Sequence, residues 1–184
     1  MIAIEAGLLK AHTMLSHIEN GAPRAISNAL NRTIDGAKTD VVREVVAQYD
    51  IKPGGIRKII TVAKAFPSKL TASIGSSGSP IPLIQFSVNP SKPTKGQSQQ
   101  VSVSVKRSGG KAIPGAFIAR ASSGKVAVMA RVGKERLPIK ELFGPAIPQM
   151  MGEPGVKERI LAGAEERFTK RIDHEIAWLL EKGK

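Results

Sequence analysis

The chain is 184 residues long, is 41% hydrophobic, has a net charge of +13 and contains no cysteine. This length suits one domain of ordinary size, and the hydrophobic fraction is sufficient for a core. The lack of cysteine excludes disulfides and thiolate metal sites. There is no apolar run of about 18 residues, and the first residues lack the basic and apolar regions of a signal peptide, so we expect neither a membrane span nor a signal peptide.

The excess of positive over negative charge is confined to the middle of the chain. Residues 51–134 contain 14 Lys and Arg and no Asp or Glu, whereas residues 1–50 have a net charge of −1 and residues 135–184 are neutral. A surface of one sign favours nucleic acid, an acidic protein or anionic lipid as a partner, although a solvated Lys-rich surface has the same composition. The predicted basic face comprises Lys92, Lys95, Lys106, Arg107, Lys111, Arg120, Lys125, Arg131 and Lys134.

The first 50 residues predict helices. Apolar residues recur every three or four positions from Ile4 to Ile18 and again from Ile26 to Val45. The sequence Asn-Gly-Ala-Pro at 20–23 separates the two runs, and proline suits the first turn of a new helix. We therefore expect two helices, or one long helix kinked at Pro23.

Residues 51–151 predict a central antiparallel sheet of about five strands. Residues 56–65 are ambiguous and favour a short helix leading into a strand. Stretches rich in Gly, Ser or Pro then separate five strand-like runs, of which 101–105 alternates most clearly between apolar and polar residues. The candidate strands are 69–75, 80–88, 101–105, 116–121 and 126–132.

The last segment, 152–184, predicts one long helix. Apolar residues occur at every fourth position from Val156 to Leu180, so the stripe winds by about 40° per step. Such a helix can pack one end on its own sheet and the other on a neighbouring subunit, or both ends within one subunit. We expect an α+β fold with segments 1–50 (helical), 51–151 (basic β) and 152–184 (helix packed on the sheet) forming one domain.

Residue patterns for catalysis and metal binding are weak. His12 and His17 are five residues apart, a spacing that does not place two side chains on one helix face, and His174 lies between two acidic residues on the last helix. The middle segment has no carboxylate for acid–base chemistry, and the Gly-rich stretch 108–112 lacks the spacing of a phosphate loop. We therefore expect no enzyme activity, no cofactor and no metal. An enzyme would need a pocket that contains a carboxylate or histidine.

The proline-rich stretch between the last predicted strand and the last helix is the candidate docking segment. Proline fixes φ, and a rigid loop loses little entropy when it docks on a partner. The alternative is that these residues close the protein's own core beneath the last helix. The predicted docking residues are Arg136, Leu137, Pro138, Lys140, Leu142, Phe143, Gly144, Pro145, Ile147 and Pro148.

Three stretches in this order resemble the prophage minor tail protein Z family. They are GAFIAR at 115–120, GKVAVMAR at 124–131 and RLPIKELFGPAIPQM at 136–150. The resemblance implies a virion structural protein without a catalytic site, acting in tail completion or head–tail joining of long-tailed phages of the lambda type. It also implies a location in the tail or neck of the virion, and in the host cytoplasm during assembly.

The partners follow from the same resemblance. Related neck proteins form rings, so it implies a homo-oligomer, with a hexamer preferred, that contacts other tail or neck proteins. The basic face would meet threading DNA or an acidic neighbouring ring. A non-specific DNA-binding protein is the alternative function, and neither a membrane nor a small-molecule substrate is expected.

Overall fold

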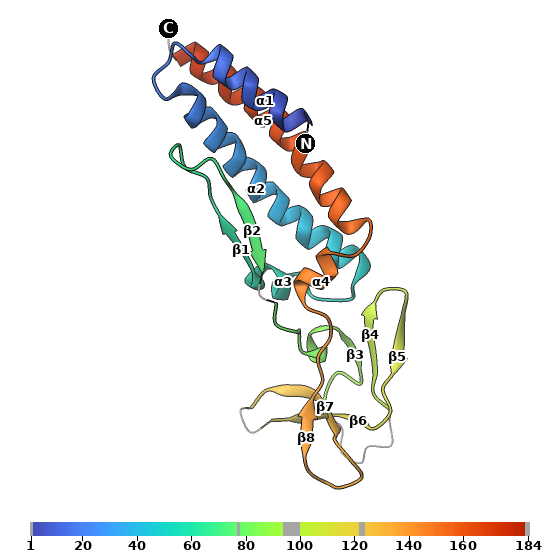
Figure 1. Ribbon diagram of the computed structural model, residues 1–184. Helices are drawn as coiled ribbons and strands as arrows, with labels where there is room; N and C mark the ends of the chain where they lie inside the picture. The colour runs from blue at the N-terminus through green and yellow to red at the C-terminus, as the bar shows by residue number, and fades with distance from the viewer. Residues whose placement is uncertain (1, 77, 94–99, 122–123, 183–184) are drawn as a thin grey trace. The chain divides into compact units, whose positions relative to one another are not determined.

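The computed structural model describes residues 2–76, 78–93, 100–121 and 124–182 (Figure 1). It has the expected α+β composition, with helices first, strands in the middle and a long helix last. The chain folds into two compact units. Unit 1 consists of Met1–Val42, Ile60–Ser76 and Glu153–Lys184, and unit 2 of Arg43–Ile59 and Ser77–Gly152.

Unit 1 is built mainly from three helices that lie side by side, α1 (Ile2–Met14), α2 (Gly21–Gln48) and α5 (Val156–Lys182) (Figure 1). Residues from Arg43 to the end of α2 belong to unit 2. The predicted interruption near Pro23 is confirmed. Asn20 adopts a positive φ of 54° just before α2 begins, and Pro23 lies in the first turn of α2, where a missing N–H costs no helix hydrogen bond.

The core of unit 1 lies between these helices. Small side chains of α1 and α2 face larger ones of α5, and a Cβ on Gly7 would lie only 3.1 Å from Ile172. The predicted stripe of α5 is buried from Val156 to Ile176 except at Ala164, which is partly buried; beyond it, Leu179 is buried and Leu180 only partly. Sequence analysis placed this helix on the sheet, whereas its buried residues from Phe168 to Leu179 cluster with buried residues between positions 11 and 29. The core residues are Ala11, Leu15, Ala22, Ala25, Ile26, Ala29, Phe168, Ile172, Ile176 and Leu179.

A β-hairpin completes unit 1. Its strands β1 (Ile60–Ala63) and β2 (Ser73–Ser76) are antiparallel. The side chain of Asn31 on α2 holds the hairpin in place, because Nδ2 donates to the carbonyl of Ala65 at 2.9 Å and Oδ1 accepts from its N–H at 2.8 Å. Two such bonds to the backbone of one residue fix both the distance and the orientation of the hairpin relative to α2.

Unit 2 contains two three-stranded antiparallel sheets. One has the order β3-β4-β5 and the other β6-β7-β8. Short helices α3 (Pro53–Ile59) and α4 (Ile147–Met151) and a 3-10 turn, η1 (Leu83–Gln85), complete the unit. The strands are β3 (Ser87–Asn89), β4 (Ser102–Lys106), β5 (Gly109–Ala112), β6 (Ala116–Arg120), β7 (Val126–Arg131) and β8 (Ile139–Glu141).

The expected single sheet of about five strands is therefore replaced by three small sheets with eight strands among the described residues. The predicted strand 80–88 forms η1 and the short β3, because Pro80 and Pro82 cannot donate ladder hydrogen bonds. The helix-then-strand reading of 56–65 is confirmed by α3 and β1. No helix among the described residues is long and apolar enough to span a membrane.

Candidate interaction surfaces

The first half of the predicted docking segment is exposed. Every residue from Arg131 to Glu141 is exposed, including the loop between β7 and β8 that contains Arg136, Leu137 and Pro138. Lys140 lies in β8 opposite Ala130 of β7. These residues are available to a partner.

The second half of the segment is attached to the rest of unit 2. Leu142 is half-buried, and its carbonyl accepts from the N–H of Leu83 at 3.0 Å, while the N–H of Gly144 donates to the carbonyl of Ile81 at 2.7 Å. A Cβ on Gly144 would lie 2.8 Å from the ring of Phe86, so this close approach requires glycine. The backbone here acts as an additional strand-like connection within unit 2.

The last docking residues divide between surface and core. Phe143 is 51% exposed, Pro145 is half-buried, and Pro148 is exposed in the first turn of α4. Ile147 is fully buried, so the expectation that it offers an exposed apolar contact is wrong. It occupies the first position of α4, where Gln149 Oε1 accepts from the N–H of Ala146 at 2.9 Å and fixes the start of the helix.

The exposed residues around β7 and β8 form one continuous stretch of chain, the β7–β8 surface. We define it by Arg131, Val132, Lys134, Arg136, Leu137, Ile139, Lys140 and Phe143. Register places Ile139 opposite Arg131, and the guanidinium of Arg131 lies 5.6 Å from the ring centre of Phe117 on β6. This stacking contact holds Arg131 at the surface and favours a defined side-chain position.

All eight described residues of the predicted basic face are exposed and belong to unit 2, whereas Lys95 lies outside the described residues. The first group is associated with β3, β4 and β5 and comprises Lys92, Lys106, Arg107 and Lys111. The second group is associated with β6 and β7 and comprises Arg120, Lys125, Arg131 and Lys134. The basic residues therefore divide between two sheets.

Several of these cations have fixed positions. Arg107 Nε donates to the carbonyl of Val46 at 2.8 Å, and Arg120 Nη1 donates to the carbonyl of Gly124 at 2.9 Å. The Lys106 ammonium lies 5.8 Å from the ring centre of Tyr49. The hydrogen bonds of Arg107 and Arg120 go to neutral carbonyl groups.

Charge separates between the two units. Unit 2 holds 15 Lys and Arg against 4 Asp and Glu, a net charge of +11, while unit 1 holds 13 against 11, a net charge of +2. The middle segment of the sequence thus corresponds largely to one folded unit. An acidic partner would be attracted mainly to unit 2.

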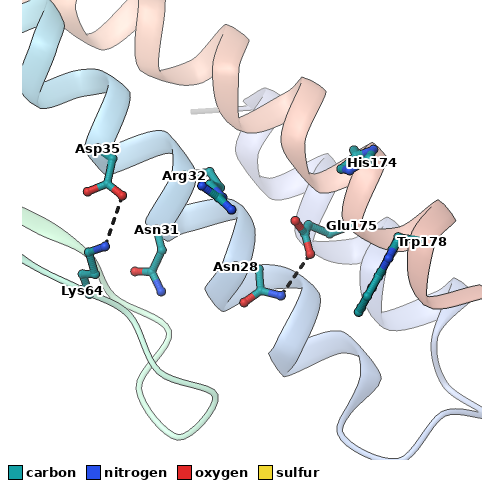
Figure 2. Close-up of a pocket in the computed structure, with 8 residues that line it drawn as sticks. All are labelled: Asn28, Asn31, Arg32, Asp35, Lys64, His174, Glu175 and Trp178. Carbon is teal, nitrogen blue, oxygen red and sulfur yellow. Dashed lines mark hydrogen bonds and ion pairs between the residues drawn. The ribbon is translucent and has the colours of Figure 1, made fainter. Parts of the chain in front are cut away.

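Unit 1 contains a polar cleft that sequence analysis did not identify (Figure 2). Its volume is about 530 Å³, and α2, α5 and the β1 end of the hairpin line it. Asn28 Nδ2 donates to Glu175 Oε2 at 3.0 Å, and Lys64 pairs with Asp35 at 3.2 Å. The cleft thus has two cations and two carboxylates, which gives it no net attraction for one sign of charge. Its lining residues are Asn28, Asn31, Arg32, Asp35, Lys64, His174, Glu175 and Trp178.

Both carboxylates of the cleft have partners within it. Glu175 accepts a hydrogen bond from Asn28, and Asp35 pairs with Lys64. Elsewhere on α5, a hydrogen bond from Lys170 and its positive charge lower the pKa of the Glu166 carboxyl. Within the described part of the chain, no three His, Asp or Glu side chains gather closely enough to hold a metal ion.

Comparison with known proteins gives one match. A family model described as prophage minor tail protein Z (GPZ) matches residues 6–182. The match includes both units and the three stretches that carry the sequence resemblance. No curated protein and no solved structure matches the chain.

Proposed function

The chain belongs to the prophage minor tail protein Z family, and from this premise we propose that it is a tail-completion protein that forms a ring at the tail end or head–tail junction. The observation that carries the proposal is the family match over residues 6–182, which leaves neither unit outside the family's pattern. Its role is structural, so binding surfaces rather than reacting groups define its function.

Self-association is assigned to unit 1. Its net charge of +2 imposes little repulsion between copies, and apolar side chains remain on its helices. Leu9 on α1 is 71% exposed and Leu161 on α5 is 52% exposed. These side chains support contacts between neighbouring subunits, with a hexamer as the preferred state.

The proposal is tested by measuring molecular mass in solution and incorporation into particles. Light scattering with size-exclusion chromatography should give a multiple of the 19.6 kDa chain mass, alone or after tails are added. Particles made with a tagged chain should contain the tag in their tails. A strict monomer that is also absent from purified particles would contradict the proposal.

The alternative is a non-specific DNA-binding protein, which the +11 charge of unit 2 favours. Binding to duplex phosphates would show a steep dependence on salt, because each neutralised phosphate releases a counterion. A chain that binds duplex DNA steeply with salt and never enters particles would support this alternative.

A further inference from the structure

Apolar side chains are concentrated on the β7–β8 surface. Ten large hydrophobic side chains are exposed among the described residues, and four of them fall between residues 131 and 143. Leu137 is 66% exposed and Val132 is 59% exposed, and Ile139 and Phe143 accompany them. So many exposed apolar groups in a short stretch indicate a surface that is covered by another molecule.

Cations lie among these apolar side chains. Between residues 116 and 143 there are six Lys and Arg and two Glu, a net charge of +4. Arginine is among the residues that contribute most to protein–protein binding, and this surface contains Arg131 and Arg136. The matching surface would combine carboxylates with apolar side chains.

Nucleic acid fits the charge but not the apolar groups. Duplex binding depends on phosphate contacts, to which Leu, Ile and Val contribute little, and single-strand binding depends on stacking aromatics. Phe143 is the only exposed aromatic residue of the β7–β8 surface. The exposed aliphatic side chains would therefore remain uncovered on DNA.

A second copy of unit 2 does not fit either, because two units of charge +11 would repel each other. Addition of a partner strand at β8 is also disfavoured. This strand is only three residues long, follows Pro138 and carries Lys140 and Glu141, features that protect sheet edges from pairing. Side chains rather than edge hydrogen bonds must therefore supply the contact.

We infer that the β7–β8 surface binds an acidic protein of the tail, different from the chain itself, through its aliphatic side chains and surrounding cations. This inference rests on the proposed function. Under this inference unit 1 mediates self-association, and unit 2 binds the acidic tail protein. The acidic partner contributes an apolar patch with carboxylates at its rim.

The test uses tails purified from particles assembled without this chain, with co-sedimentation of the added full-length protein. Leu137→Ser with Ile139→Ser should weaken binding about tenfold, because it removes apolar contact area. Arg136→Ala with Lys140→Ala should weaken binding about threefold and reduce its salt dependence. All four side chains are exposed, so the fold should be retained, and circular dichroism checks this.

Matched controls change similar side chains elsewhere. Leu9→Ser with Leu161→Ser removes exposed apolar groups from unit 1. Lys52→Ala with Lys58→Ala removes two exposed cations of unit 2, one just before α3 and one within it. The lysine control should bind tails within about twofold of the wild type if charge position matters. The leucine control tests whether self-association and tail binding use different surfaces. Self-association of this variant is measured by light scattering. Its tail binding is measured by co-sedimentation at concentrations where the wild type is assembled.

The outcomes distinguish the surface from the proposed function. If wild-type protein binds tails and the Leu137→Ser, Ile139→Ser variant binds equally well, the inference is overturned while the function stands. If the Leu137→Ser, Ile139→Ser variant instead loses affinity for a short fluorescent DNA duplex, the partner of this surface is DNA. If it loses self-association, the partner is a second copy of the chain. Either result also overturns the inference. If wild-type protein neither binds tails nor enters particles, the proposed function itself fails.

Discussion

The ion pair between Asp40 on α2 and Arg167 on α5 predicts a coupling between two positions of unit 1. The Asp40 side chain is 4% exposed, and Arg167 Nη1 lies 2.8 Å from its Oδ2. Gly36 lies one turn before Asp40, and a Cβ there would come within 2.6 Å of Arg167 Cδ and Cζ. Glycine at this position therefore leaves room for the arginine, and the effects of Gly36→Ala and Arg167→Ala should depend on each other.

The expected magnitudes follow from burial. Arg167→Ala leaves a buried carboxylate without this cation and should lower the free energy of unfolding by about 2 to 4 kcal/mol. The effect falls towards the lower end because the Arg167 side chain is 32% exposed and Asp40 has a further interaction. Gly36→Ala alone forces the arginine aside and should cost about 1 to 3 kcal/mol.

The sign should reverse in the double variant. Once Arg167 is alanine, the space beside Gly36 is open, and Gly36→Ala should stabilise the protein by about 0.5 to 1 kcal/mol through helix propensity. A double-mutant cycle in urea measures this coupling directly. Fluorescence of Trp178 is a suitable signal, because it is the only tryptophan and lies in unit 1.

A control separates this pair from surface charge in general. Lys170→Ala removes an exposed ion pair with Glu166, in which the Lys170 and Glu166 side chains are 74% and 69% exposed, and should change stability far less than Arg167→Ala does. If Gly36→Ala destabilises the wild type and the Arg167→Ala variant equally, the arginine is not the obstacle. The reasoning would then be refuted.

Three further predictions concern single positions. Asn31→Ala removes both hydrogen bonds to Ala65 and should cost about 1 to 3 kcal/mol, with faster hydrogen exchange at the Ala65 amide; unchanged exchange would contradict the anchoring role. Because the pKa of Glu166 is lowered in the folded protein, the carboxylate stabilises the fold at pH values above the pKa it has in the unfolded chain, and this stabilisation is lost as the pH falls through its folded-state pKa. Lys170→Ala should raise the folded-state pKa of Glu166 in an NMR titration. Gly144→Ala drives a methyl group into the aromatic ring beside it and should cost about 1 to 3 kcal/mol in thermal unfolding, whereas an unchanged melting temperature would show that the ring moves freely.

The helices could be predicted from the sequence because their burial follows a local period. The stripe from Val156 to Ile176 and the break before Pro23 are both readable within a few turns of chain. The elements that pack against the last helix could not be predicted, because an apolar stripe shows which side of a helix is buried but not which element covers it. Packing on α1 and α2 depends on residues more than 130 positions away, such as Leu15 and Ile172.

The sheets were harder to predict because strand pairing is a long-range choice. The alternation at 101–105 identified β4, but β5 and β8 are exposed strands of three or four residues with no apolar alternation. At the candidate site, the predicted docking residues Arg136, Leu137 and Pro138 are exposed, and their docking role stays a prediction. The sequence did not show that Ile147 is buried, since burial there depends on where α4 begins.

The separation of charge between the units implies that salt acts on them differently. A net charge of +11 produces repulsion within unit 2 that added salt screens, whereas unit 1, at +2, has little repulsion to relieve. The only tyrosine, Tyr49, is buried in unit 2, and the only tryptophan is in unit 1. Each unit therefore contains its own fluorescent reporter. Rising ionic strength should stabilise unit 2 against denaturation and leave unit 1 nearly unchanged, so that high salt, and equally a bound polyanion, stabilises the basic unit selectively.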